Sequence, residues 1–430
     1  MPSPQKKKTE PKKDFQTPRG MRDILPRMQY IWEKVRKTAK DIGGYYNFSR
    51  IETPIVEYAE LFERGVGKGT DIVEKEMFTV HSKSKDRLVM RPEGTAACVR
   101  AYNEHGMSHL SQPVKLYYEG PMFRHERPQA GRWRQHYQVG YELLGGESDP
   151  IYDAQIILVA VRFFEELKIN DLEVRLNSIG CKTCRPPYIK ELLQFYRSKK
   201  KELCVDCKNR LTANPLRLLD CKQEACIALR VSAPIFVDHL CKDCNDHFKA
   251  VLEYLEELHL PYVLDHYLVR GLDYYSHTVF ELVTQEGKLS LAGGGRYNYL
   301  IELLGGKKTP AVGVAIGLDR TIDLILERKL KVIPRQRPKV FLICVGELAK
   351  KRSLTLIEHL RTGRIDVQES LGKISLNAQL KSADKHGAPI ALLFGQKEAF
   401  EESVIVRDMK TGAQETVPIA KMADIIRKKL

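Results

Sequence analysis

The sequence lacks any long hydrophobic run, and no apolar stretch approaches the roughly 20 residues of a membrane-spanning helix. Its first residues, MPSPQKKKTEPKKD, contain no apolar segment of the kind found in secretion signals. They also lack arginine, contain acidic residues and are interrupted by proline, which argues against a mitochondrial presequence. We therefore expect residues 1–14 to be a disordered basic tail, and the protein to be cytoplasmic and without membrane contact.

Two common nucleotide-binding motifs are also missing. The sequence contains neither GxxxxGK followed by Ser or Thr, nor GxGxxG after a strand-like segment. Internal repeats are likewise not evident. A nucleotide, if one binds, must therefore be held in a different way.

The chain has 430 residues, which suggests about two to four domains. Its formal net charge is +15, and residues 335–430 carry 18 Lys and Arg against 11 Asp and Glu, which leaves +7. A basic surface favours a polyanionic partner such as nucleic acid. A basic face that is only solvated would give the same composition, so charge alone does not decide between the two.

The first part of the chain combines a helix with a long hairpin. Apolar residues recur at helical spacing from Ile31 to Ile42, and Gly43-Gly44 is expected to end that helix. In residues 114–144, two strand-like runs flank a polar loop with Gly and Pro, which predicts an antiparallel hairpin. The segment YDAQIILVAVRFFEEL then predicts a buried helix.

The rest of the chain changes character three times. Eight of the ten cysteines lie between Cys181 and Cys244. After them, LAGGGRYNYLIELLGG predicts a glycine loop that leads into a helix, and AVGVAIGLDRTIDLILER predicts a strand or turn followed by a helix. VIPRQRPKV is typical of a linker, and beyond it strand-like segments alternate with helices around Leu354–Leu360 and Leu376–His386, as in a small α/β domain.

The segment FRHERPQAGRWRQHYQVGYELLGG, residues 123–146, carries the densest chemistry. It holds four arginines, which suit phosphate or carboxylate ligands: Arg124, Arg127, Arg132 and Arg134. If QHYQVGYELL is extended, alternate residues face opposite sides, and Gln138, Gly140 and Glu142 share one side. That side is either the floor of a ligand site or a solvent-facing strand surface.

Three further segments offer candidate ligand groups. Glu93 and Thr95 precede a helical pattern, so Glu93 either caps that helix or binds a ligand ammonium. Arg270 stands beside Gly271 in LVRGLDYYSHTVFEL, at what looks like the end of an apolar strand. Arg320, in GLDR at the start of a helix, is placed to meet an anion with help from the helix dipole.

The cysteines fall into four closely spaced pairs: Cys181/Cys184, Cys204/Cys207, Cys221/Cys226 and Cys241/Cys244. In a cytosolic protein such spacing favours zinc over disulfides. Eight ligands allow two all-thiolate sites, one site with spare thiols, or buried reduced thiols without metal. Cys98 and Cys344 lie in apolar contexts and are expected in the core.

Taken together, these segments resemble the histidyl-tRNA synthetases, a family of class II aminoacyl-tRNA synthetases. The segments TPRGMRDILP, MRPEGT, FRHERPQAGRWRQHYQVGYELLG, LVRGLDYY, LAGGGRY and AVGVAIGLDR occur in the family's order, and the resemblance spans roughly residues 15–430. One departure is Ser276-His277, where many relatives have a polar residue and Arg.

The resemblance implies an ATP-dependent ligation of L-histidine to tRNA(His), through histidyl-adenylate, with release of AMP and diphosphate. It implies Arg124 and Arg270 as the catalytic residues that clamp the α-phosphate. Arg132 and Arg320 would hold the outer phosphates of ATP together with Mg2+. The histidine site implied is Glu93, Gly94, Thr95, Arg124, Gln138, Glu142, Arg270, Tyr274 and Tyr275, in which Glu93 and Thr95 take the ammonium and Glu142 with the tyrosines reads the imidazole. Arg127 and Gln129 would touch the tRNA acceptor end.

The fold class implied is α+β. A catalytic domain on an antiparallel sheet is expected over residues 15–335, with a helical Cys-rich insertion at 177–258 and an α/β anticodon-binding domain at 336–430. The insertion resembles one found in some bacterial relatives, and structural Zn2+ on its eight cysteines is a candidate. The resemblance also implies a homodimer, with residues 43–56 near its interface.

Two other functions compete with the ligase. A non-catalytic, histidine-sensing regulatory paralogue resembles the catalytic domain but typically loses active-site arginines and the C-terminal domain. This chain keeps Arg124, Arg270 and Arg320 and has a C-terminal α/β segment. A simple tRNA-binding module does not explain a complete set of ATP and amino-acid residues.

Overall fold

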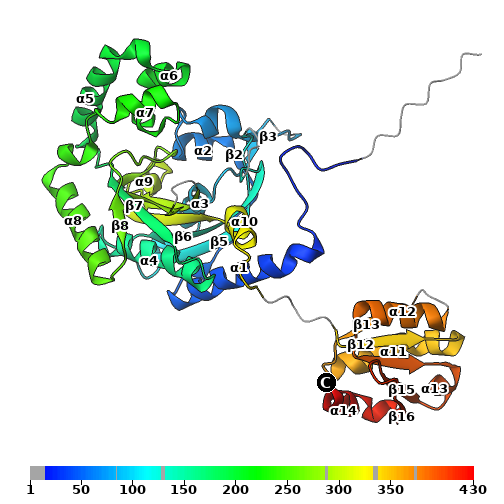
Figure 1. Cartoon of the computed structure of the whole chain (residues 1–430). Coiled ribbons are helices and arrows are strands. Elements are labelled where there is room, and N and C mark those ends of the chain that lie inside the picture. Colours follow the sequence, from blue (N-terminus) through cyan, green and yellow to red (C-terminus); the bar gives the residue numbers. More distant parts are fainter. Residues whose placement is uncertain (1–14, 84, 127–130, 286–288, 333–337, 372–374) are drawn as a thin grey trace, which may run out of the picture. The chain divides into compact units, whose positions relative to one another are not determined.

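The computed structural model describes residues 15–83, 85–126, 131–285, 289–332, 338–371 and 375–430. The predicted tail 1–14, most of the predicted linker, and Arg127 and Gln129 lie outside the described residues. The chain divides into two compact units, residues 1–332 and 333–430 (Figure 1). None of the described helices is both long enough and apolar enough to cross a membrane.

An eight-stranded sheet forms the centre of the first unit, in the order β1-β5-β6-β11-β10-β9-β7-β8. Its six central strands pair antiparallel, and only the outermost pairs, β1 with β5 and β7 with β8, are parallel. The strands are β1 (Ser49–Arg50), β5 (Val114–Phe123), β6 (Gln135–Leu144), β7 (Leu172–Ser178), β8 (Tyr262–Leu264), β9 (Ser276–Thr284), β10 (Ser290–Arg296) and β11 (Ala311–Gly317). The predicted hairpin is β5 and β6, paired along ten residues from Val114↔Leu144 to Phe123↔Gln135.

A second, three-stranded sheet and a set of helices complete this unit. The small sheet has β2 (Val56–Tyr58), β3 (Phe78–Val80) and β4 (Leu88–Met90). The helices are α1 (Pro26–Tyr45), α2 (Ala59–Gly65), α3 (Thr95–Glu104), α4 (Ile151–Glu166), α5 (Arg185–Ser198), α6 (Val205–Ala213), α7 (Glu224–Arg230), α8 (Lys242–Glu257), α9 (Leu300–Leu303) and α10 (Leu318–Glu327), with short turns η1 (Ile72–Glu76), η2 (Met107–His109), η3 (Lys200–Glu202), η4 (Pro215–Asp220) and η5 (Phe236–His239).

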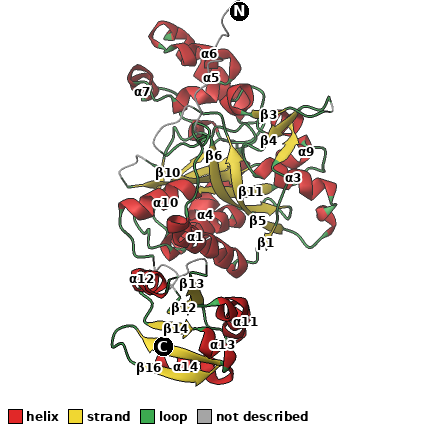
Figure 2. Cartoon of the chain, turned by 90° about the vertical axis from the view of Figure 1, so that its right-hand side faces the viewer, coloured by secondary structure: helices red, strands yellow, loops and turns green. Residues whose placement is uncertain are grey.

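One face of the large sheet is covered by α1, α4 and α10, which Figure 2 shows stacked in front of the strands. Val139, Tyr141 and Leu143 of β6 point into this core, as their alternation predicts. The opposite face of β6 is therefore free to form a site. The prediction that Gly43-Gly44 ends α1 is wrong, because the helix continues to Tyr45.

Two glycine-based predictions are corrected by tertiary contacts. A Cβ at Gly43 would lie only 3.1 Å from the Tyr117 ring, so this glycine allows helix α1 to pack against β5 rather than ending the helix. The predicted glycine loop in LAGGGRY is strand β10. A Cβ at Gly293 would lie 2.3 Å from the Arg270 guanidinium, so the strand lacks side chains where another group must approach closely.

The Cys-rich segment is helical, as expected, and contains α5, α6 and α7 before it returns to the sheet through α8. Figures 1 and 2 both show α5, α6 and α7 gathered at the end of the sheet opposite α1. Arg270 does not sit at the end of a strand, since β8 stops at Leu264 and β9 begins at Ser276. It lies instead in the connecting loop, residues 265–275.

The second unit is a separate α/β domain on a five-stranded sheet ordered β13-β12-β14-β15-β16. The first three strands of that order are parallel and the last two pair antiparallel. The alternation predicted for this region is confirmed by β12 (Val340–Cys344), α11 (Glu347–Thr362), β13 (Val367–Glu369), α12 (Leu376–His386) and β14 (Ile390–Phe394), followed by α13 (Gln396–Phe400), β15 (Ser403–Asp408), β16 (Gln414–Pro418) and α14 (Ile419–Lys429).

Candidate active site

A cavity opens on the face of the sheet opposite α1 and α4. Nine of the predicted site residues line it: Glu93, Thr95, Arg124, Arg132, Gln138, Arg270, Tyr274, Tyr275 and Arg320. They come from the hairpin, the start of α3, the 265–275 loop and the start of α10. Segments separated by more than 200 residues in sequence therefore meet around a single pocket, in which the sequence motifs converge.

Three arginines gather at one end of the cavity. Arg124 follows directly after β5, Arg132 lies in the hairpin loop, and Arg320 is in the first turn of α10. Among the described residues that line the cavity, Glu126 is the carboxylate closest to this group, 3.0 Å from Arg132 Nη1 and 4.0 Å from Arg124 Nη1. Burial lowers the pKa of Arg320, and the nearby Arg132 charge lowers it further. This excess of positive charge at a helix N-terminus suits a polyanion.

The backbone fixes two of these guanidinium groups. Arg124 Nε donates to the Pro92 carbonyl at 2.8 Å, while Arg320 donates to the Gly131 carbonyl at 3.0 Å and to the Ser290 carbonyl at 2.7 Å. Each arginine therefore reaches the cavity already oriented, and a ligand need not order it.

Arg270 approaches the same cavity from the 265–275 loop. Its guanidinium pairs with Glu281 of β9, lies 5.8 Å from the Tyr275 ring centroid and occupies the space above Gly293. Burial is the largest influence on its pKa and lowers it, but the Glu281 charge together with Tyr275 and Tyr274 raises the pKa overall. Arg270 Nε is buried and has no hydrogen-bond partner among the described residues, so it retains a donor for a ligand.

Glu93 serves the helix and the cavity together. Its two carboxylate oxygens accept the backbone N–H groups of Thr95 at 2.6 Å and Ala96 at 2.9 Å, in the first turn of α3. The helix-cap interpretation is therefore correct, and the same carboxylate still lines the cavity. Burial raises the pKa of Glu93, while the two backbone hydrogen bonds and the Arg124 charge lower it in part.

Glu142 lies behind the cavity wall rather than in it. It is 1% exposed, and its oxygens accept hydrogen bonds from Thr95 Oγ1 at 2.7 Å and from the Tyr297 hydroxyl. Its carboxylate fills the space above Gly313, where a Cβ would clash with it. Burial raises the pKa of Glu142 to about 8, although both hydroxyl hydrogen bonds oppose the shift. Of the described residues that the family resemblance implies for ATP and histidine, Glu142 and Gly94 are the two that do not line the cavity.

Gly94 and Gly140 make room for an aromatic ring that the sequence analysis missed. A Cβ at either glycine would lie within 2.3 Å of the Tyr118 ring, which is buried between the two. Tyr118 pairs with Gly140 across the hairpin, so the ring lies across its neighbouring strand. The two glycines thus admit this buried ring next to Glu142 and Thr95 rather than lining the cavity themselves. Tyr274 and Tyr275, which do line it, have ring centroids 4.6 Å apart.

His136 and Gln138, on one face of β6, also line the cavity. Burial lowers the pKa of His136 to about 3, helped by the Arg124 and Arg320 charges, so its imidazole is neutral near pH 7. Gln138 Oε1 is buried and lacks a partner among the described residues, which leaves an acceptor for a ligand donor. His136 was not predicted, although it lies two residues from Gln138, at the spacing that places both on one strand face.

Arg134 lies away from the cavity. Its guanidinium donates to the Glu126 carbonyl at 3.3 Å and the Arg19 carbonyl at 3.5 Å, and its side chain packs against Gly20. This arginine therefore fastens the N-terminal segment to the hairpin loop. Arg127 and Gln129 lie outside the described residues.

The eight paired cysteines form two groups of four. In each group, all sulfur atoms lie within 4.8 Å of one another; the groups are Cys181, Cys184, Cys241 and Cys244, and Cys204, Cys207, Cys221 and Cys226. The Sγ separations are 3.6 Å for Cys181–Cys184, 4.0 Å for Cys181–Cys241 and 3.8 Å for Cys204–Cys221. Tetrahedral zinc with Zn–S bonds of about 2.3 Å requires sulfurs about 3.8 Å apart, so the donors fit this metal.

Cys98 and Cys344, by contrast, are single buried cysteines in apolar clusters, as predicted.

Comparison with known proteins agrees with the motifs. The family model described as histidyl-tRNA synthetase matches residues 20–321, and the one described as anticodon binding domain matches residues 339–429. A protein named histidine–tRNA ligase from Dehalococcoides mccartyi is 46% identical over 97% of this chain and 100% of its own length. One of the same name from Thermodesulfovibrio yellowstonii is 43% identical over 96% of this chain and 98% of its own.

Solved structures give the same result. Apo histidyl-tRNA synthetase from S. aureus is 32% identical, with a TM-score of 0.78, and the match covers 96% of this chain and 99% of that one. A Bacillus halodurans structure described as an ATP phosphoribosyltransferase regulatory subunit/histidyl-tRNA synthetase matches with a TM-score of 0.60 over 86% of this chain and 96% of that one. Its identity is only 21%, so that likeness is one of fold.

Proposed function

The chain belongs to the histidyl-tRNA synthetase family, and we propose from this premise how its pocket divides between ATP and histidine. It is an aminoacyl-tRNA synthetase that ligates histidine to tRNA(His) through a histidyl-adenylate intermediate. The observation that carries the division is the cavity itself, which has fixed arginines at one end and buried acceptors with a tyrosine pair at the other. A triphosphate and a cationic amino acid need those opposite surroundings.

The arginine end binds ATP. Arg132 and Arg320 hold the outer phosphates, while Arg124 and Arg270 hold the α-phosphate that histidine attacks. The histidine carboxylate displaces diphosphate from that phosphorus, and fixed guanidinium groups stabilise the added negative charge in the transition state. Mg2+ bound together with ATP would supply neutralisation of the phosphate charge. Glu126, a hard oxygen donor beside the arginines, suits that ion.

The other end binds histidine. Glu93 and the free Gln138 oxygen take the α-ammonium group, while Thr95 lies between this position and Glu142. A carboxylate oxygen can accept two hydrogen bonds, and each oxygen of Glu142 accepts one from a hydroxyl group, so the carboxylate can also bind an imidazole N–H. With Tyr274 and Tyr275, this arrangement rejects amino acids that lack the ring nitrogens, because they would leave buried polar groups unpaired.

The regulatory alternative is not favoured. A histidine sensor has no need for oriented arginines, yet Arg124 and Arg320 are held by backbone carbonyls and Arg270 by Glu281. The relatives that match nearly the full chain at 43–46% identity carry the ligase name.

The second unit, at about residues 336–430, binds the anticodon stem-loop, and the hairpin loop with Arg127 and Gln129 meets the acceptor end. The family match over residues 339–429 and the charge of +7 over residues 335–430 support this role. The catalytic domain is then about 15–335, interrupted by the insertion at about 177–258. We propose a cytoplasmic location as well, because cytoplasmic protein synthesis uses the tRNA substrate.

The protein acts as a homodimer through the region of β1 and β2. Large apolar side chains are exposed there, including Tyr45, Ile55, Val56 and Tyr58. A cluster of exposed apolar residues beside the edge strand β1 is typical of a surface that another subunit covers. This surface overlaps residues 43–56, the segment that the family uses for pairing.

The insertion holds structural Zn2+ in two all-thiolate sites. One four-cysteine group joins the start of the insertion to the start of α8, and the other joins Cys204 and Cys207 to Cys221 and Cys226, so a bound metal in each would cross-link the insertion and stabilise it. The metal would have no part in the chemistry at the cavity.

The test is the histidine-dependent exchange of labelled diphosphate into ATP by the full-length protein. We expect exchange with histidine and background exchange with the other amino acids and with histidinol, which lacks the carboxylate. Exchange that does not depend on histidine would contradict the proposed division of the pocket.

A further inference from the structure

The Cys-rich insertion makes direct contact with the loop that carries Arg270 and the tyrosine pair. Asn214, just after α6, donates to Asp273 Oδ1 at 2.7 Å. A Cβ at Gly271 would lie 2.8 Å from Arg217 Nη1, so the Arg217 guanidinium rests on the backbone beside Arg270. The insertion therefore packs against residues 270–275 from outside the cavity.

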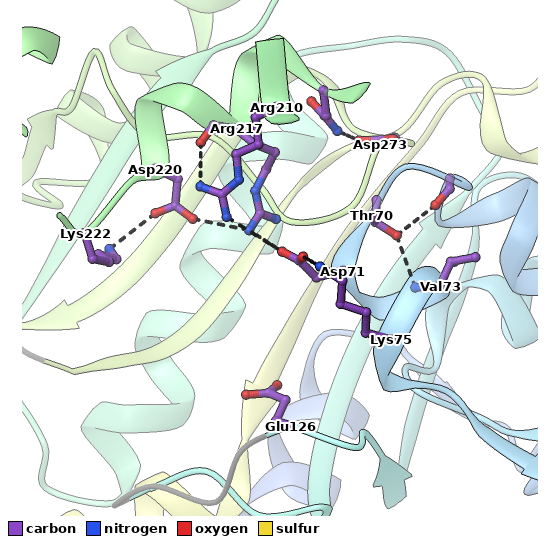
Figure 3. Close-up of polar contacts among 12 residues, drawn as sticks. Thr70, Asp71, Val73, Lys75, Glu126, Arg210, Arg217, Asp220, Lys222 and Asp273 are labelled. Carbon is purple, nitrogen blue, oxygen red and sulfur yellow. Dashed lines mark hydrogen bonds and ion pairs between the residues drawn. The ribbon is translucent and has the colours of Figure 1, made fainter. Parts of the chain in front are cut away.

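Asp71, in the catalytic core, connects Arg217 and a second arginine of the insertion, Arg210, to that core. Figure 3 shows Arg210 and Arg217 both directed toward Asp71, which precedes η1. Arg217 Nη2 lies 3.5 Å and Arg210 Nη2 3.8 Å from Asp71 Oδ2. Arg210 Nη1 also donates to the Arg217 carbonyl at 3.2 Å. Asp220, 3.7 Å from Arg217, adds a second carboxylate from the insertion itself.

The segment that carries Asp71 holds the other side of the loop. The Asp273 N–H donates to the Val66 carbonyl at 2.9 Å. Gly67 has a φ of +104°, and a Cβ there would lie 2.4 Å from Asp273 Oδ2. Residues 270–275 are thus enclosed between segment 66–71 and the insertion, and Asp71 joins these two sides to each other.

The cysteine groups lie at the base of these contacts. Cys207 and Arg210 share helix α6, and Arg217 is in η4, which ends immediately before Cys221. In the other group, Cys184 precedes Arg185, which donates to the Tyr275 carbonyl. The segments that reach the loop therefore also carry the two four-sulfur groups.

We propose that Arg217 is a positioning residue for histidine use, which with Asp71 holds the 270–275 loop in its binding conformation. This inference rests on the proposed function, because it takes that loop to bind histidine. Arg217 does not line the cavity and acts only through the loop. A partly exposed ion pair adds little to global stability, whereas a small displacement of binding groups can cost on the order of 10²-fold in rate.

The experiment compares Arg217→Ala, Arg217→Lys and Asp71→Ala with Lys208→Ala as a matched control. Lys208 is an exposed basic residue on α6, close to Arg210. The diphosphate-exchange assay gives KM for histidine and for ATP. Amide hydrogen exchange separately measures how well the Asp273 N–H is protected. We expect R217A and D71A to raise KM for histidine about tenfold and to lower kcat, because the same loop carries Arg270. KM for ATP should stay within about twofold of wild type, because Arg124 and Arg320 are held by backbone carbonyls outside this loop. R217K should restore most of the wild-type KM for histidine. The double variant R217A/D71A should have a KM for histidine no higher than that of R217A, because both changes remove the same ion pair.

The loop itself provides a readout that is independent of catalysis. Amide exchange in residues 270–275 should be faster in R217A and unchanged in K208A. Asn214→Ala, which removes only the hydrogen bond to Asp273, replaces R217A in the test if R217A does not fold. It should also raise KM for histidine and speed amide exchange in residues 270–275. A different outcome is a wild-type enzyme that shows histidine-dependent diphosphate exchange while R217A equals K208A in both its histidine KM and its amide exchange in the loop. That result would refute the role of Arg217 and leave the proposed function intact. Wild-type protein without that exchange would overturn both this inference and the proposed function.

Discussion

Glu142 allows a sharp test of how the pocket recognises imidazole, because its carboxyl group titrates in an accessible range. Burial raises its pKa to about 8, so the carboxyl group of the empty pocket is mostly protonated at pH 7. With that pKa, the ionised fraction rises from about one tenth at pH 7 to one half at pH 8. If the ionised carboxylate accepts the imidazole N–H, affinity for histidine should rise about fivefold over this interval.

Glu142→Gln keeps the shape of the side chain but removes its titration. A hydrogen bond to a charged group contributes roughly 1.5–3 kcal/mol, so affinity for histidine at pH 8 should fall by about 10- to 100-fold. The difference from wild type should shrink by about fivefold at pH 7, where the wild-type carboxyl group is itself mostly neutral. Affinity for ATP should change little, because Glu142 is remote from the arginine end.

The assay is calorimetric titration of histidine and of ATP at several values between pH 7 and pH 8. The imidazole of the substrate has a pKa of about 6.5, so about a quarter of it is protonated at pH 7 and almost none at pH 8. E142Q retains this small substrate contribution, so the difference between the wild-type and E142Q slopes reports on the protein. Glu119→Gln is the matched control, since Glu119 lies on the same hairpin but pairs with Arg36 of α1. A flat wild-type profile, a slope retained in E142Q, or a loss confined to ATP would each refute the assignment of Glu142 to imidazole.

Three further outcomes are expected. Arg270→Ala should fold normally by thermal melting and slow adenylate formation by about 10²–10³-fold, and wild-type exchange in this variant would rule out a role at the α-phosphate. Elemental analysis of protein purified without chelator should find about two zinc ions per chain, given the two four-thiolate groups; only trace zinc would instead indicate reduced thiols. Deletion of residues 336–430 should reduce tRNA charging far more than diphosphate exchange, and this charging should weaken steeply with salt; an equal loss of both activities in a folded dimer would mean that the second unit supports the cavity.

Regular periodicity was the part of the sequence that predicted structure well. The alternation around Val139 and Tyr141 placed the core face of β6, and the segment Ala311–Gly317 with its following helix matched β11 and α10. Glycine was less informative, because its role depends on a partner elsewhere in the chain. Gly43 makes space for Tyr117 and Gly293 makes space for Arg270, and neither partner is evident from the local sequence.

The sequence predicted which residues and motifs form the site. It did not predict how deeply Glu142 is buried or which residues outside the motifs hold the site in place. Burial behind Thr95 sets the pKa of Glu142, and that burial arises only when β6, α3 and Tyr297 pack together. Four cysteine pairs permit several groupings, and the helices decide which segments meet. Arg217 belongs to no motif, since its role comes from its position against Gly271 and Asp71.

Charging of purified tRNA(His) with labelled histidine tests the central claim most directly. The full-length protein with ATP and Mg2+ should attach histidine to the 3′ end of tRNA(His), and it should leave tRNAs for other amino acids and other labelled amino acids uncharged. A folded protein that binds histidine and ATP but forms no histidyl-tRNA would contradict the assignment of this chain as a ligase.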